Sequence, residues 1–161
     1  MKEVRVLSPT AILGYGFPEE SFMAGLERKP DIIAADAGST DPGPYYLGSG
    51  VSFTDREAVK RDLKYMLMAG REHGIPVLIG TAGGSGAEPH LVWTKDIVME
   101  IAREENLSFR MAVIHGEINK EDVLTEFRKG RVAELPPGKP LTEDDIGDST
   151  HIVGQMGVEP F

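Results

Sequence analysis

The sequence predicts an α/β fold built on an open, mostly parallel sheet, and three observations carry that prediction. Short apolar runs alternate with segments of helical periodicity along the chain. The runs are rich in β-branched or small apolar residues, and turn-forming residues separate each run from the next segment. Capping residues mark the starts of the helical segments. This alternation is typical of a parallel sheet, and we expect about four or five strands with helices on both faces.

Four segments are expected to form strands, because each is a short apolar run that ends in small or polar residues. They are VRVL (4–7), DIIAAD (31–36), PVLIGTAG (76–83) and FRMAVIHG (109–116).

The helices are predicted from their ends. Thr54 and Glu57 form a candidate capping box, and Gly74 ends the helix that comes after it. Asn119 and Thr142 are expected to cap two further helices near the C-terminus. Another helix begins near residue 89 and carries an apolar stripe that would pack on the sheet, formed by Trp93, Ile97, Val98 and Ile101.

Composition limits the class of protein. The chain has 161 residues, which is the size of one domain, and we expect residues 1–161 to form a single α/β domain. A formal charge of −9 argues against a nucleic-acid partner. The absence of cysteine excludes disulfides and thiolate chemistry. No signal peptide or membrane-length apolar run is present, so we expect a cytoplasmic protein with no membrane partner.

Polar residues lie at the carboxyl end of the second predicted strand, and open parallel sheets bind ligands at that edge. Asp36 is a candidate catalytic acid or base, and Ser39, Thr40 and Asp41 come next as candidate substrate-binding residues. Proline and glycine at 42–44 prevent the strand from continuing.

The loop after the third predicted strand, GTAGGSGAEPH, is rich in glycine and precedes a helix. Backbone N–H groups in such a loop can bind a phosphate or a carboxylate. The loop lacks the Gly-Lys-Ser/Thr of a nucleotide-binding P-loop, and its spacing departs from G-x-G-x-x-G. The fold is therefore predicted to be Rossmann-like without a dinucleotide fingerprint. The candidate substrate-binding residues are Thr81, Gly83, Gly84, Ser85, Gly86 and His90.

The fourth predicted strand ends in His115 and Glu117, which would emerge at the same edge as Asp36 and are candidate catalytic residues. Each of these groups also has an ordinary structural explanation, such as capping a turn. The earlier loop with Gly14 and Gly16 offers N–H groups to an anion or simply forms a turn. No cofactor is predicted. The carboxylates and the imidazole are suitable ligands for a divalent metal ion, so metal binding is left as an open alternative.

The stretches LSPTAILGYGFPEESF, ADAGSTDPGPYYLGSG, GTAGGSGAEPH and DSTHIVGQMGVEPF resemble the N-terminal region of the acyclic terpene utilisation (AtuA-like) family. The resemblance runs over essentially the whole chain. Family members continue beyond the GQMGVEP block, so the chain would be a short or split version of a longer family protein. The resemblance implies bacterial catabolism of branched acids, and it leaves a CoA thioester open as a bound group.

Two functions are left as hypotheses. The first is a lyase or hydratase that acts on a small branched acid or acyl-CoA, with Asp36 or His115 moving the proton next to a carbonyl. The alternative is a non-catalytic binding or regulatory subunit that completes a partner's site. The partners expected are a small anionic metabolite and either a second copy of the chain or a second protein subunit, because the apolar segment 152–161 needs something to pack on.

Overall fold

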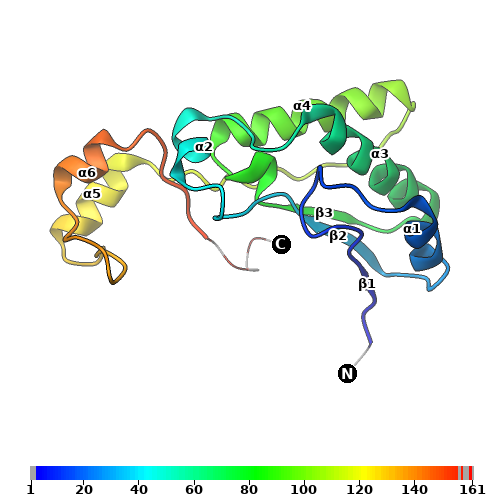
Figure 1. Cartoon of the computed structure of the whole chain (residues 1–161), viewed down its shortest axis with the longest axis horizontal. Helices are drawn as coiled ribbons and strands as arrows, with labels where there is room; N and C mark the ends of the chain where they lie inside the picture. Colours follow the sequence, from blue (N-terminus) through cyan, green and yellow to red (C-terminus); the bar gives the residue numbers. More distant parts are fainter. Residues whose placement is uncertain (1–2, 156, 158–159, 161) are drawn as a thin grey trace.

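The computed structural model describes residues 3–155, 157 and 160. Its centre is an open, parallel, three-stranded sheet in the order β1–β2–β3 (Figure 1). The strands are β1 (Val6–Leu7), β2 (Ile32–Asp36) and β3 (Val77–Gly80). The predicted α/β class and the parallel sheet are confirmed. Much of the end of the apolar segment 152–161, which was expected to pack on a partner, lies outside the described residues.

Helices account for most of the regular structure. The two longest, α3 and α4, pack side by side over the sheet, and α5 and α6 form a lobe that extends away from it (Figure 1). None of the helices in the described part of the chain is long and apolar enough to cross a bilayer. The helices are α1 (Glu19–Leu26), α2 (Pro44–Ser49), α3 (Arg56–His73), the 3-10 turn η1 (Ala82–Gly84), α4 (Glu88–Glu104), α5 (Lys120–Arg128) and α6 (Glu143–Asp148).

The structure does not confirm a sheet of four or five strands or helices on both of its faces. Residues 109–116, predicted as the fourth strand, form no strand with any other described segment. The chain there passes beyond β3 without pairing to it. Its only ladder contact among the described residues is an isolated antiparallel bridge just afterwards, between Glu117 and Val153.

The register of the sheet decides which side chains enter the core. Ile33 lies opposite Val77, and Ala35 lies opposite Ile79, so these four residues project from the same face. Helices α3 and α4 cover that face with side chains at helical spacing. The fully buried members of this core include Ile33, Leu63, Met66, Ile97 and Ile101.

The helix ends agree with the sequence in most places. Asn119 caps α5, Thr142 forms a capping box at α6, and Gly74 ends α3 in the left-handed conformation. The cap of α3 was predicted one residue too early. Asp55 accepts the Ala58 N–H at 2.9 Å, whereas the Thr54 hydroxyl lies 2.9 Å from that of Ser52.

A buried carboxylate holds the loop after β1. Asp62 on α3 is fully buried, and its Oδ2 accepts the N–H groups of Gly14 at 2.9 Å and Gly16 at 3.1 Å. Its Oδ1 accepts from the Arg61 guanidinium at 2.8 Å. These glycines therefore do face an anion, which is one of the two roles expected of the loop, but the anion is a side chain of the protein itself.

Removing this carboxylate should destabilise the fold strongly. We expect Asp62→Ala to cost about 2–4 kcal/mol, because it leaves two partly buried N–H groups without their acceptor and removes one partner of the half-exposed Arg61 guanidinium. Asp62→Asn should cost less, since an amide oxygen can keep the position of Oδ2. Urea unfolding measures both changes, with Asp96→Asn on the exposed surface of α4 as the control. An Asp62→Ala protein as stable as that control would contradict the assignment.

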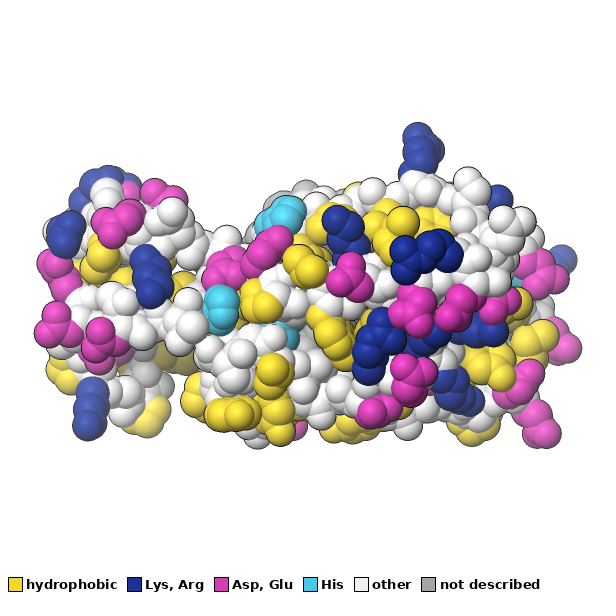
Figure 2. Space-filling model, turned by 90° about the horizontal axis from the view of Figure 1, so that it is seen from above, with side chains coloured by type: hydrophobic (Ala, Val, Ile, Leu, Met, Phe, Trp, Pro, Cys, Tyr) yellow, Lys and Arg dark blue, Asp and Glu magenta, His cyan; other side chains and the backbone are white. Residues whose placement is uncertain are grey.

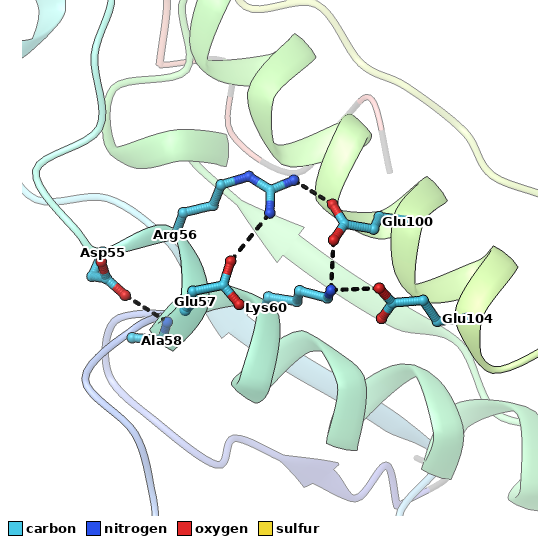
Figure 3. A network of polar contacts seen from close by, with 7 residues as sticks. All are labelled: Asp55, Arg56, Glu57, Ala58, Lys60, Glu100 and Glu104. Atoms are coloured by element: carbon cyan, nitrogen blue, oxygen red, sulfur yellow. Dashed lines mark hydrogen bonds and ion pairs between the residues drawn. The ribbon is translucent and has the colours of Figure 1, made fainter.

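A charged network joins α3 to α4 on the outer surface (Figure 3). Glu100 on α4 accepts from Arg56 and from Lys60, both on α3, at 2.5 Å in each case. Lys60 also contacts Glu104 at 2.8 Å. The hydrogen bond from Arg56, followed by that from Lys60, lowers the pKa of Glu100 from 4.5 to about 2.

The network predicts a particular dependence of stability on pH. Because the pKa of Glu100 falls on folding, its contribution is complete above pH 4.5 and is lost as the pH falls towards 2. We therefore expect Glu100→Gln to lower Tm at neutral pH and to have a much smaller effect at the acidic end of this range. Thermal melts across that range test this. Asp96→Asn, one helical turn earlier, is the matched control and should lack the trend.

Candidate functional site

The carboxyl ends of β2 and β3 open into a large cavity. Asp36, the last residue of β2, lies opposite Gly80, the last residue of β3. The cavity has a volume of about 1310 Å³. Its walls are β3, the end of α3, one stripe of α4, the loops after β2 and β3, residues 109–114, and part of the C-terminal segment, residues 153–155 and Gly157. Such an edge is where open parallel sheets bind ligands.

Asp36 lines this cavity with an exposed carboxylate. Its Oδ1 accepts the N–H of Gly38 at 3.0 Å, and the carboxylate forms no ion pair within the described part of the chain. Gly80, beside it, has no side chain to shield it. The carboxylate is therefore accessible to a molecule in the cavity.

The loop after β2 contributes two of its three predicted residues. Ser39 and Thr40 line the cavity, and Asp41 does not. The N–H of Asp41 donates to the Ser39 hydroxyl oxygen at 3.2 Å. Pro44 then begins the short helix α2, which sequence reasoning missed because proline and glycine at 42–44 were interpreted only as a barrier. Proline is in fact well suited to the first turn of a helix.

The loop after β3 supplies the opposite wall. Thr81, Gly84, Ser85 and Gly86 line the cavity. Gly83 instead turns inward, where an added Cβ would come within 2.6 Å of the His90 carbonyl oxygen. The glycine is thus required for packing beneath the loop.

His90 also lies beneath the loop and does not line the cavity. It is 1% exposed, and its Nε2 lies 3.1 Å from the carbonyl oxygens of both Tyr46 and Val51. In this position it can donate either to α2, through Tyr46, or to the segment that follows α2, through Val51. The structure therefore places His90 where it supports the loops and not where it meets a ligand.

Two glycines allow close packing around the loop after β3, and one of them, Gly38, lets the loop after β2 touch it. A Cβ on Gly38 would lie 2.2 Å from the Thr81 Cγ2 and 2.7 Å from the Gly84 carbonyl oxygen. Thr81 has a φ of 47°, which is uncommon for a β-branched residue and is imposed by the tight turn. Gly84 packs in the same way against the Phe53 ring.

His115 and Glu117 are not brought to Asp36, and neither of them lines the cavity. They form a second cluster at the start of α4. His115 Nδ1 lies 2.8 Å from a Glu88 carboxylate oxygen. Glu117 accepts the N–H of Glu88 at 2.7 Å and lies 2.6 Å from His151 Nδ1. Burial alone would raise the pKa of Glu117, but the N–H of Glu88 and the His151 ring together hold it below its usual value.

Sequence reasoning missed His151 and Glu88 as members of this cluster. His151 comes after α6, in the irregular segment that returns to the body of the protein. Residues 116–118 and 152–154 pair at this point, with Ile118 N–H donating to the Ile152 carbonyl oxygen at 2.8 Å. Histidine side chains gather near this waist between the lobe and the body (Figure 2). Nothing in the spacing of the residues along the sequence indicates that residues 152–154 pair with residues 116–118.

The amide groups predicted to bind an anion at the start of α4 are partly taken by Glu117, through the N–H of Glu88. The cavity offers cations instead. Arg71, Lys95 and Arg110 line it, and they form no ion pair with any described residue. Asp36 is the single carboxylate in the described lining. A cavity with three unpaired cations in a chain of net charge −9 is suited to an acidic ligand.

No metal centre is formed by the described residues, because they contain no group of three histidine or acidic side chains arranged to hold an ion. Comparison with protein-family models, with curated proteins and with solved structures gives no match to this chain. We therefore infer its function from the geometry of the site.

The contact between the two loops can be tested with matched glycine substitutions. Gly38→Ala should cost about 1–3 kcal/mol, because the added methyl group meets Thr81 and the Gly84 backbone. Gly48→Ala is the control, since it lies in α2 with open space around its Cα and should be neutral or slightly stabilising. Urea unfolding of both proteins gives the comparison. Equal stability of the two variants would contradict the proposed contact.

Proposed function

We propose that this chain is the ligand-binding α/β domain of a lyase- or hydratase-type enzyme that acts on a small branched acid or its acyl-CoA thioester. The observation that carries the proposal is one accessible carboxylate, Asp36, in a cavity that otherwise presents hydroxyl groups and unpaired cations. The resemblance to the acyclic terpene utilisation family supports the choice of substrate class and of bacterial catabolism as the setting.

The chemistry proposed assigns one role to each part of the cavity. Asp36 removes or returns the proton on the carbon next to the substrate carbonyl. The hydroxyl groups of Ser39 and Ser85 donate hydrogen bonds to the enolate oxygen that develops. Lys95, on the stripe of α4 that faces the cavity, binds the carboxylate of the acid or a phosphate of the thioester.

His115 and Glu117 have a different role in this proposal. Because Glu117 accepts from the first residue of α4 and contacts His151, the two residues fasten the lobe of α5 and α6 to the body. The separation of this cluster from the cavity favours the second candidate, a binding or regulatory subunit in which Asp36 recognises a ligand without performing chemistry. The two functions differ in whether the loss of the Asp36 charge affects turnover or only binding.

Substitution of Asp36 separates the two candidates. A thermal-shift panel first identifies the ligand class, using a branched-chain acyl-CoA, the free acid and CoA itself. For the ligand that stabilises the chain, we expect Asp36→Asn to lower turnover at least about 100-fold while binding changes little.

The matched control is Asp41→Asn, which is a neighbouring acid that does not line the cavity. It should keep full activity. Ligand binding by the unmodified chain without any turnover would favour the regulatory subunit. Turnover that survives Asp36→Asn unchanged would rule out Asp36 as the base.

A further inference from the structure

The outer edge of β3 has free backbone groups. Pro76 and Gly80 accept hydrogen bonds from β2 through their carbonyl oxygens, at 3.0 and 2.8 Å. In a parallel pair, alternate residues point to the same neighbour, so Leu78 also faces β2. Val77 and Ile79 then direct their N–H and C=O groups away from β2, and no described backbone group pairs with them there. All four residues of β3 are only partly buried, although strands in an α/β core are usually covered.

Residues 108–115 present a second set of free backbone groups. None of these eight residues donates or accepts a backbone hydrogen bond with another described residue. The segment nevertheless has the composition of a strand, with Phe109, Met111, Val113 and Ile114 among its members. Figure 1 shows that it runs the length of α4 in the opposite direction to that helix. A βαβ unit has this geometry, so the segment runs parallel to β3.

The two unpaired segments line the same cavity, which residues 153–155 and Gly157 also border. Val77–Gly80 and residues 109–114 line the one cavity of about 1310 Å³, which exceeds the 300–1,000 Å³ usual for a small-molecule site. An unpaired strand edge is a ready template for pairing with another chain. A β-strand offers N–H and C=O groups on two sides, so one inserted strand can pair with both walls at once.

We infer that two copies of this chain assemble by exchanging residues 108–115, so that each copy places this segment between β3 and residues 108–115 of the other. The order of strands across the dimer is then β1, β2, β3, the partner's segment, the chain's own segment, and the partner's β3, β2 and β1. A two-fold axis lies between the two exchanged segments. The same contact between a segment and the partner's β3 therefore occurs twice, as in a closed symmetric dimer. Every backbone group of both segments gains a neighbour on each side. The inference does not rest on the proposed function.

Charge complementarity supports the second copy as the occupant. The two-fold axis makes the inserted segment antiparallel to β3, so its beginning lies at the carboxyl edge of the sheet. Arg110 of the inserted segment then lies at the level of Asp36, the carboxylate of the cavity that forms no ion pair with a described residue. A parallel insertion would instead place that guanidinium towards Arg71, at the other end of β3. The antiparallel exchange therefore also brings a cation of the second copy to the candidate site.

The assembly is tested by mass measurements in solution. Sedimentation velocity and light scattering should give twice the 17.5 kDa of one chain. Ala112→Pro removes a backbone N–H from the middle of the exchanged segment and should give a monomer. Ala133→Pro is the matched control, because Ala133 is also exposed and its N–H makes no described hydrogen bond, but it lies in the α5–α6 lobe. The control should remain dimeric. Circular dichroism establishes that both variants are folded.

The contact between charges provides a second measurement. Asp36→Lys and Arg110→Glu should each weaken the dimer about tenfold or more, and the double variant should recover most of the loss. A monomer at every concentration of the unmodified chain would overturn the inference. A dimer that survives Ala112→Pro, or one in which the double charge variant is weaker than either single variant, would overturn the exchanged arrangement.

Discussion

The close contact between the loops after β2 and β3 is the constraint on which the candidate site depends. Register alone places Asp36 next to Gly80, but the loops can converge only because Gly38 has no side chain to meet Thr81. Thr81 has a left-handed conformation at this contact, and Gly84 lines the cavity beside it. A methyl group at residue 38 would therefore affect both the packing of the sheet edge and the shape of the site.

The chain uses its own carboxylates where the sequence indicated external anions. Asp62 accepts hydrogen bonds from the N–H groups of Gly14 and Gly16, and Glu117 accepts one from the first N–H of α4. Some carboxylates of this acidic protein therefore accept hydrogen bonds from the backbone of its own loops. The cavity cations that form no ion pair with a described residue, such as Lys95, are then available to a ligand. Local positive charge in the cavity is therefore compatible with a net charge of −9 over the chain.

The sequence predicted those features that depend on neighbouring residues. The caps at Asn119 and Thr142 and the placement of Asp36 at a strand end are all set by local spacing. It did not predict the α3 cap, because a threonine and an aspartate stand side by side, and the threonine hydroxyl contacts Ser52 while the aspartate accepts from Ala58. The cluster of His151 with Glu117 joins residues 34 positions apart across the α5–α6 lobe. No periodicity or motif specifies a contact of that range.

The predicted fourth strand differs from these cases. Its residues have the composition of a strand, but no described segment of the chain pairs with it. Residues 109–114 have the composition of a strand and lie along the cavity wall, yet a strand forms only when a neighbour supplies the hydrogen bonds. Local propensity can therefore be correct for a segment while the pairing is not found within one chain. Because β3 leads directly into the glycine-rich loop, a strand that pairs with its free edge would lie beside the candidate site.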